Sequence, residues 1–382
     1  MPASHNHSPW GTPPWRIDFT PARRDLPAAA DFAVIGAGFS GLAAAAWLRL
    51  LAPERSVAVL EGGRIGHGAS GRTGGMALDG AAADDLPGLE DVLGGVERIL
   101  GTLEVECDLS LPGAWEVGRR QAAVKNSPIE WQDSGVLRVV NEVRGGTLDP
   151  GKLVAGLGRA AERLGATIAE NHPVQRVDWS RDSVEIHFPG GKLRAAKALF
   201  ATNGLSLGLS GLEDNATPKL TLATLTAPLP EKQLAEIGLA HRKPFYTVDL
   251  PYLWGRVRED NSLLLGAGLV DAPRSNDLEE VDIRDGAASQ MFAAFEVRMR
   301  RLHPALENLR ITDRWGGPIL FRGGWNPVFA EHPSSGRGIV LGAYAGHGVA
   351  LSSFLGAWAA EVLLDKRGLP EWGAIALKRQ SR

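Results

Sequence analysis

The segment GAGFSG at residues 36–41 constrains the fold of this chain more than any other feature. It follows the short apolar run 31–36 and precedes residues 42–51, a run of strong helix formers without a breaker. A second apolar run ends at Glu61, which follows the last glycine by 20 residues. This order predicts a Rossmann-type dinucleotide-binding unit, which consists of a strand, a glycine turn, a helix and a second strand that ends in an acid. The alternative is a glycine-rich turn in an unrelated α/β protein.

Each glycine of this segment has a distinct expected task. Gly36 permits the tight turn, Gly38 lets a pyrophosphate approach the backbone, and Gly41 lets the helix pack close to the strand. The helix N-terminus then offers free N–H groups and a partial positive charge to the phosphates. Glu61 can accept hydrogen bonds from ribose hydroxyls and would repel a 2′-phosphate, which favours FAD or NAD over NADP.

The composition limits the class of protein. A chain of 382 residues is long enough for two or three domains, and its net charge of −3 gives no reason to expect a nucleic-acid partner. No apolar run reaches the ~18 residues of a membrane span, and residues 1–30 lack the apolar stretch of a secretory signal. With one cysteine, Cys107, we expect no disulfide, no metal site and a cytoplasmic location.

The loop after Glu61 is dense in glycine, which is typical either of a flexible linker or of backbone that closely approaches a ligand. Residues 64–75, RIGHGASGRTGG, resemble the D-amino-acid oxidase superfamily of FAD-dependent amine and amino-acid oxidoreductases. Its γ-glutamylputrescine oxidoreductase branch has a very similar loop, usually with Asn in place of Thr73. The resemblance implies that this loop runs under the FAD pyrophosphate and reaches the isoalloxazine ring.

The resemblance extends to residues 150–179, to the A-T-x-G segment that includes Ala201 and Thr202, and to the GHGV turn at 346–349. It implies a backbone contact of adenine with the strand that holds Val174. The implied FAD-binding residues are Gly36, Gly38, Phe39, Ser40, Gly41, Glu61, Gly62, Arg64, Ser70, Arg72, Thr73, Gly74, Gly75, Met76, Val174, Ala201, Thr202, Gly346, His347, Gly348 and Val349.

Three residues are candidates for catalysis. His347 opens the last helix, whose N-terminus would stabilise the negative charge of reduced flavin, and the histidine either contacts the flavin edge or caps the helix. Arg256 lies in the predicted hairpin 251–268, and in amino-acid oxidases an arginine of this region pairs with the substrate carboxylate. The alternative is an arginine on a solvated strand face. Trp315 either stacks near the flavin or belongs to the core.

The predicted fold class is α/β, with a discontinuous Rossmann-type FAD-binding domain and an inserted α+β substrate domain on a mixed or antiparallel sheet. Residues 1–28 form a proline-rich tail that Trp10 and Trp15 can pin to the body. The FAD-binding domain takes 29–76, 150–205 and 310–382, and the substrate-binding domain takes 77–149 and 206–309.

The chain departs from its relatives in three places. The stretch 118–134 is shorter by tens of residues than the corresponding stretch of the relatives. The tail or a neighbouring subunit could fill the space that this leaves. Residues 314–329 contain no cysteine, so we expect noncovalent FAD. Leucines in 262–268 replace the lysine that speeds the oxygen reaction in sarcosine-type oxidases, which disfavours oxygen as the acceptor.

The predicted function is FAD-dependent oxidation of the carbon–nitrogen bond of an amine or amino acid, by hydride transfer to flavin N5. The substrate partner is a small molecule, the electron acceptor is unknown, and a homo-oligomer is compatible with the sequence. Two alternatives stay open at this point. One is a flavin-dependent tailoring enzyme on a larger substrate, and the other is an FAD-carrying subunit that has lost its substrate pocket.

Overall fold

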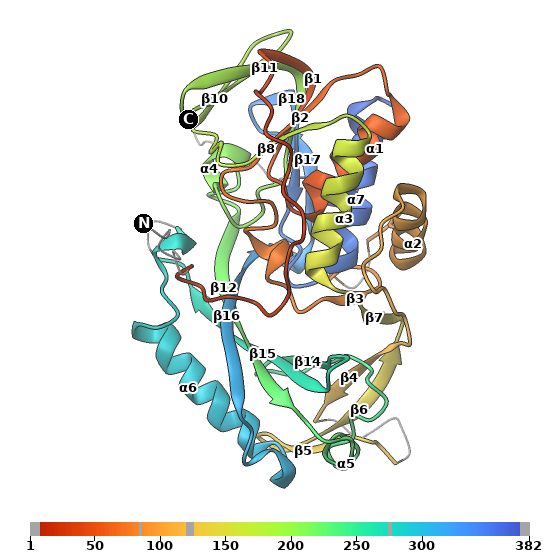
Figure 1. The fold of residues 1–382 in the computed structure, drawn as a ribbon, viewed down its shortest axis with the longest axis vertical. Helices are drawn as coiled ribbons and strands as arrows, with labels where there is room; N and C mark the ends of the chain where they lie inside the picture. Colours follow the sequence, from red (N-terminus) through yellow and green to blue (C-terminus); the bar gives the residue numbers. More distant parts are fainter. Residues whose placement is uncertain (1–7, 84–85, 120–125, 274–276, 375–382) are drawn as a thin grey trace.

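Two large sheets, one above the other, organise the molecule (Figure 1). The computed structural model describes residues 8–83, 86–119, 126–273 and 277–374. The first seven residues of the predicted tail, residues 120–125 of the shortened stretch and the last eight residues therefore lie outside the described part. The predicted α/β class, with a Rossmann-type half and a largely antiparallel half, is confirmed.

The first sheet has a parallel centre in which β1 pairs with both β2 and β11. β18 and β8 extend it in parallel, and β17 closes one edge in antiparallel orientation. β9 and β10 continue from β11 as an antiparallel extension. The strands are β1 Ala29–Ile35, β2 Val57–Leu60, β8 Thr167–Ala169, β9 Arg176–Trp179, β10 Val184–Phe188, β11 Gly191–Phe200, β17 Val328–His332 and β18 Ser335–Gly342.

Three helices, α1 (Phe39–Leu51), α3 (Pro150–Arg163) and α7 (Gly348–Leu363), form a layer against this sheet, and α2 (Val92–Leu103) packs on α7 (Figure 1). β2 is buried along its whole length, which explains its uninterrupted apolar sequence, because both faces of the sheet are covered. α1 packs so closely on α7 that a Cβ on Gly356 would lie 2.4 Å from the Ser40 carbonyl oxygen.

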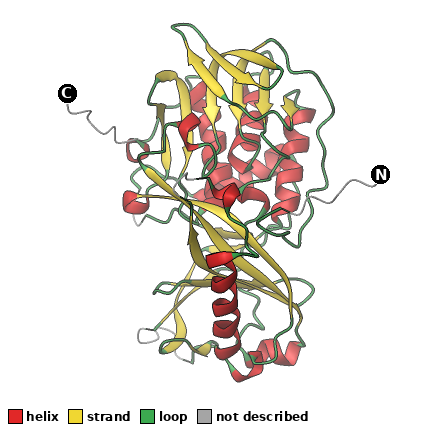
Figure 2. Ribbon diagram, turned by 90° about the vertical axis from the view of Figure 1, so that its left-hand side faces the viewer, coloured by secondary structure: helices red, strands yellow, loops and turns green. Residues whose placement is uncertain are grey.

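The second sheet runs in the order β16-β12-β15-β14-β13-β4-β6-β5. Figure 2 shows its long strands extending from the upper half into the lower half of the molecule, where α6 lies across them. Its elements are β4 Ala114–Gly118, β5 Glu130–Gln132, β6 Val136–Val143, β12 Ala216–Pro228, β13 Phe245–Thr247, β14 Leu253–Val257, β15 Ser262–Asp271, β16 Ile311–Arg322 and α6 Gly286–Arg301. The remaining strands and α-helices of the described residues are β3 Met76–Leu78, β7 Gly145–Thr147, α4 Leu207–Ser210 and α5 Glu231–Glu236.

β16 links the two halves. The sequence-based division assigned it to the FAD-binding domain, but it pairs with β12 along residues 311–322 within the second sheet. The predicted hairpin 251–268 is present as β14 and β15. The domain boundaries themselves stay a prediction.

The described part of the N-terminal tail packs against the body through two tryptophans. Trp10 is buried and donates its indole N–H to the Leu278 carbonyl at 2.9 Å. Trp15 is also buried and donates to the Gly71 carbonyl at 2.7 Å. The described part of the tail therefore lies against the glycine loop and β16.

Candidate functional site

A cavity of about 1450 Å³ lies between the first sheet and the second sheet. One wall, here the first wall, consists of the glycine turn 36–41, the loop 61–76 and the turn 344–349. The opposite wall, here the second wall, consists of side chains on the cavity face of the second sheet. A cavity of this volume exceeds the roughly 300–1,000 Å³ of a typical small-molecule site, so it has room for a large cofactor and a substrate together.

Glycines shape the first wall. Gly36 has a φ of +103°, which only glycine adopts without strain. A Cβ on Gly38 would lie 2.7 Å from Ser70 Oγ, and a Cβ on Gly41 would lie 1.9 Å from the Gly36 carbonyl oxygen. The turn, the helix and the loop are therefore as close as backbone atoms allow.

Glu61 is held in place by two backbone N–H groups. Oε2 accepts from Ala37 at 2.8 Å and Oε1 accepts from Gly63 at 2.9 Å. Burial raises the pKa of this carboxyl above its ordinary value. Each oxygen keeps acceptor capacity and Glu61 lines the cavity, which suits the hydroxyls of a ribose.

Two helix N-termini border the same cavity. α1 begins after Gly38 and α7 begins after His347, and neither has an acidic residue in its first turn. Helix N-termini leave backbone N–H groups without intrahelical partners and favour anions. Thr202 Oγ1, His347 Nδ1 and Ser352 Oγ are buried cavity-lining atoms without a hydrogen-bond partner among the described residues. These unpaired polar groups fit a ligand as polar as a dinucleotide.

Most of the predicted cofactor residues line the cavity. They are Gly36, Gly38, Phe39, Ser40, Glu61, Gly62, Ser70, Arg72, Thr73, Gly74, Met76, Val174, Ala201, Thr202, Gly346, His347, Gly348 and Val349. Val174 lies in the connection before β9, whereas the sequence suggested a strand. Gly41, Arg64 and Gly75 are outside the lining.

Arg72 has partners that the sequence did not suggest. Its guanidinium donates to the carbonyls of Gly11 at 2.9 Å and Gly316 at 3.2 Å, and to Ser8 Oγ at 2.8 Å. Burial lowers the pKa of Arg72 to about 10. Although the residue borders the cavity, these hydrogen bonds fasten the N-terminal tail to β16 and leave little donor capacity for phosphates.

Arg256 lies outside the cavity. Its Nη1 donates to the Leu148 carbonyl at 3.0 Å, and its Nη2 lies close behind Gly75. Burial, with the nearby charge of Arg258, lowers the pKa of Arg256 to about 10. The side chain is buried, so it is not on a solvated strand face, and it is not among the residues that line the cavity.

The second wall is a row of residues, one from each of six neighbouring strands. Consecutive pairing partners form this row, which consists of Glu116, Tyr246, Trp254, Gly266, Ala223 and Trp315. A Cβ on Gly74 would lie 2.2 Å from the Trp254 ring, and a Cβ on Gly266 would lie 2.0 Å from it. Two glycines thus make the space that lets Trp254 enter the cavity wall.

Trp315 and Tyr246, the other aromatic residues of the row, also contact residues of other segments. Trp315 is buried, donates its indole N–H to the Arg72 carbonyl at 2.9 Å, and meets Trp15 edge to face. The rings of Tyr246 and His347 lie 6.2 Å apart. Burial lowers the pKa of His347 below its ordinary value, which favours the neutral imidazole.

Sequence reasoning missed Glu116 and Tyr246. Glu116 is the one polar residue in the otherwise apolar or glycine strand AWEVG, and such a residue on a half-buried strand is a weak signal of a functional face. The Tyr246 hydroxyl donates to Glu116 Oε1 at 2.8 Å. Only the strand pairing brings them together, because their positions are 130 residues apart.

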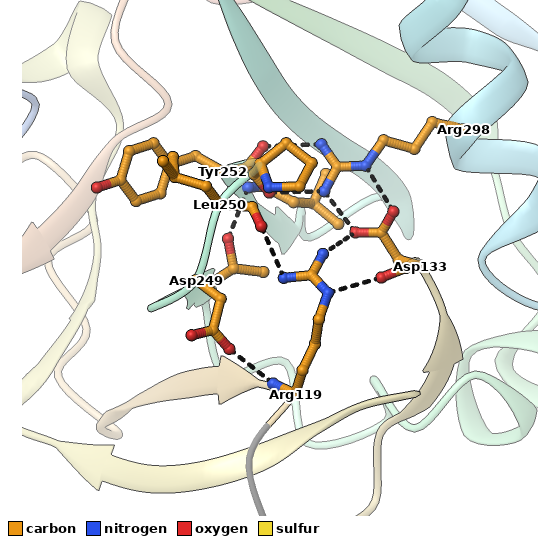
Figure 3. Close-up of polar contacts among 9 residues, drawn as sticks. Arg119, Asp133, Asp249, Leu250, Tyr252 and Arg298 are labelled. Carbon is orange, nitrogen blue, oxygen red and sulfur yellow. Dashed lines mark hydrogen bonds and ion pairs between the residues drawn. The ribbon is translucent and has the colours of Figure 1, made fainter. Parts of the chain in front are cut away.

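An ionic network supports the loop that leads from β13 to β14 (Figure 3). The Asp133 carboxylate, only 7% exposed, pairs with Arg119 and Arg298. These guanidiniums also donate to the carbonyls of Leu250, Pro251 and Tyr252. The network holds the backbone of the loop, while Leu250 and Tyr252 line the mouth of the cavity with exposed fractions of 71% and 36%.

One group of potential metal ligands occurs among the described residues, and it lies outside the cavity. Asp178, Glu185 and His187 offer ligand atoms within 4.8 Å of one another on the β9–β10 hairpin. Arg176 and Lys192 already pair with the two carboxylates. We therefore assign this cluster to surface ion pairing.

Comparisons with known proteins agree with this geometry. Residues 31–362 match the model of the family described as DAO, FAD dependent oxidoreductase. A probable oxidoreductase OrdL of Haemophilus influenzae is 26% identical, over 88% of this chain and 83% of the relative. Gamma-glutamylputrescine oxidoreductase of Escherichia coli is 25% identical, over 87% of this chain and 83% of the relative. The crystal structure of glycine oxidase from Geobacillus kaustophilus is similar in fold, with a TM-score of 0.67, 18% identity and coverage of 90% of this chain and 96% of that chain.

Within the described ranges, no helix is long and apolar enough to cross a membrane.

Proposed function

Because the chain belongs to the DAO family of FAD-dependent oxidoreductases, we propose that it holds FAD noncovalently and oxidises a carbon–nitrogen bond by hydride transfer. The family makes the chain an FAD-dependent oxidoreductase, and the relatives support amines or amino acids as its substrates. The observation that supports the finer proposal is the continuity of the cavity. It runs from the glycine turn and Glu61 to Tyr246 and Trp254 on the second wall.

The first wall supplies the groups that would hold FAD. Glu61 would bind the adenosine ribose, and the N-terminus of α1 with Ser70 would bind the pyrophosphate. The turn 346–349 and the N-terminus of α7 would face the flavin. Cys107 is buried in the core beyond the cavity lining, and burial raises the pKa of its thiol to about 12. Both facts argue against a thioether link to the cofactor.

FAD, when bound, would supply the two-electron oxidant that accepts a hydride from the carbon beside the nitrogen. The tasks of the protein are to exclude water, to orient that carbon and to stabilise developing negative charge. Trp254 and Tyr246 close the substrate side with aromatic surface. The positive end of the α7 dipole, beside a neutral His347, would stabilise the charge of the reduced cofactor. No acid–base pair is needed if the amine binds unprotonated.

The continuous cavity argues against a subunit that has lost its pocket. The exposed side chains at its mouth, Leu250, Tyr252 and Trp325, are consistent with the second candidate, a tailoring enzyme whose larger substrate reaches out of the cavity. The two enzyme candidates differ in which compounds reduce the cofactor.

The test is an anaerobic titration of the purified protein with a panel of amines and amino acids, followed by absorbance near ~450 nm, where oxidised flavin absorbs. We expect a yellow protein whose band bleaches with one class of compound. Acid precipitation should then release the flavin into the supernatant. A colourless protein that takes up no added FAD would contradict the cofactor assignment, and flavin that remains in the pellet would contradict noncovalent binding. A yellow protein that no amine or amino acid bleaches would contradict carbon–nitrogen oxidation.

A further inference from the structure

Glu116 carries a negative charge on the substrate side of the cavity. Among the described residues that line it, Glu116 is the only acid on a strand of the second sheet. It projects from β4, the strand beside β13, and stands at one end of the row that passes through Trp254 to Trp315. The residue lines the cavity and is partly buried, so bulk solvent shields its charge only in part.

The partners of this carboxylate are neutral. Oε1 accepts from the Tyr246 hydroxyl at 2.8 Å, and Oε2 accepts from the Asn141 amide at 3.0 Å. Glu116 forms no ion pair with any lysine, arginine or histidine of the described residues. A carboxylate has about four lone-pair sites, and two neutral donors leave both its charge and part of its acceptor capacity unused. A partly buried charge in this state favours a cationic partner.

A cation at Glu116 is a different group from the nitrogen that is oxidised. A nearby carboxylate favours the protonated form of an amine, whereas the carbon beside the reacting nitrogen gives up a hydride from the unprotonated form. Two strand spacings, roughly 10 Å in total, separate the backbone of Glu116 from that of Trp254, which contacts Gly74 of the glycine loop. Tyr246 lies on the strand between them and lines the cavity, as Trp254 does.

Resting on the function proposed above, we propose that the substrate is an amine with a second, positively charged group, which Glu116 binds, and with no carboxylate beside the reacting nitrogen.

The second part of the proposal rests on the cationic side chains near the cavity. Arg72 donates to backbone carbonyls and Ser8, and Arg256, whose Nη1 donates to the Leu148 carbonyl, is not among the lining residues. The Nε2 atom of His67 lies 3.7 Å from Oε1 of Glu279. Burial lowers the pKa of His347, which favours its neutral form. The described lining therefore offers no free guanidinium or ammonium group to an α-carboxylate. An amino acid would bury its carboxylate without the bidentate partner that such a group prefers.

Three matched ligands test both parts. Pentan-1-amine has one nitrogen, 1,5-diaminopentane adds the second cation, and norleucine adds a carboxylate beside the nitrogen of pentan-1-amine. Binding of each to the FAD-loaded protein is measured by isothermal titration calorimetry, separately from bleaching of the flavin. We expect the diamine to bind about ten- to hundred-fold more tightly than pentan-1-amine, and norleucine to bind most weakly.

Glu116→Gln isolates the charge, because the glutamine oxygen can still accept from Tyr246. We expect this variant to keep its FAD and melting temperature and to bind the diamine no better than pentan-1-amine. Glu130→Gln is the matched control, since Glu130 is an exposed residue of the same sheet outside the cavity lining, and it should keep the preference.

The proposal is overturned if the diamine and the monoamine bind the unmodified protein equally, if norleucine binds most tightly, or if none of the three binds. Glu116-dependent binding without bleaching by any amine or amino acid would support the charged site and contradict the proposed oxidation. Bleaching by amines or amino acids without any effect of Glu116→Gln would support the proposed oxidation and contradict the charged site.

Discussion

The two walls of the cavity are built by different means. The first wall is backbone: Gly36 turns at positive φ, and Gly38 and Gly41 leave no room for a Cβ. The second wall is side chains, with Glu116, Tyr246 and Trp254 projecting from strands that pair across the sheet. The first wall thus comes from short segments whose residues are neighbours in the chain, and the second comes from single residues on separate strands, with Glu116 lying 130 positions from Tyr246.

This difference teaches where function can vary. A backbone cradle depends on glycine and cannot change its residues without losing its shape, so it suits a cofactor that stays the same. A wall of side chains can exchange residues while the strands keep their pairing, so it suits a substrate that differs between relatives. The four predictions below test this division, from the largest expected effect to the smallest.

Gly41→Ala should have the largest effect and should act on the first wall. Its Cβ would lie 1.9 Å from the Gly36 carbonyl oxygen, and neither backbone can move away without opening the turn. We expect the free energy of unfolding to fall by about 3 kcal/mol and FAD to be lost on gel filtration. Gly101→Ala in α2, where a Cβ meets open space, is the control and should be neutral or stabilising by less than about 1 kcal/mol. A Gly41→Ala protein with one FAD per chain would contradict the backbone cradle.

Asp133→Asn should lower the stability of the second wall without changing the first wall. It leaves Arg119 and Arg298 without the carboxylate that they share, so the loop 249–252 loses its support. We expect a loss of about 2 kcal/mol in urea unfolding, with FAD still bound. Asp365→Asn removes an exposed partner of Lys197 and should change stability by less than about 1 kcal/mol. Equal losses of FAD in both Asp133→Asn and Gly41→Ala would mean that the walls are not independent.

Gly266→Ala should disturb the second wall at one ring. The new Cβ would lie 2.0 Å from Trp254, and Gly74 blocks the ring on its other side. We expect a loss of about 1–2 kcal/mol that largely disappears in a Trp254→Ala background, which gives a coupling energy of about 1 kcal/mol in a double-mutant cycle. Additive losses would show that the Trp254 ring does not fill this space in solution.

His347→Gln should have the smallest effect, confined to low pH. Burial lowers the pKa of His347 in the folded protein, so below its ordinary value of 6.5 the unfolded chain binds more protons than the folded chain. The contribution of neutral His347 is therefore complete above pH 6.5 and is lost as the pH falls toward the lowered folded value. The slope of this component is at most ~1.4 kcal/mol per pH unit. The melting temperature of the variant should fall less than that of the unmodified protein between pH 7.5 and pH 5.5, in round values. Parallel pH profiles would show that His347 is not held neutral.

Much of the first wall was predictable from the sequence. Spacing within short segments identified the glycines of 36–41, the acid at Glu61 and the GHGV turn. In the structure these segments border the same cavity. Arg72 and Arg256 show the limit of this reasoning. Their charge suggested phosphate and carboxylate partners, but the structure pairs them with backbone carbonyls of the tail, β16 and residue 148. A charged residue type does not reveal its partner when that partner is distant in the chain.

The sequence by itself predicted the Rossmann unit, because steric limits on backbone conformation act over a few residues. The loops expected to hold the cofactor, and FAD as that cofactor, were implied by the resemblance of short motifs to one family. Only the tertiary structure decided that Glu116, Tyr246, Trp254 and Trp315 form one wall. Their alignment depends on the register of six strands that come from separate parts of the chain. Register is set by long-range pairing and burial, and a shift of one residue would turn each side chain to the opposite face.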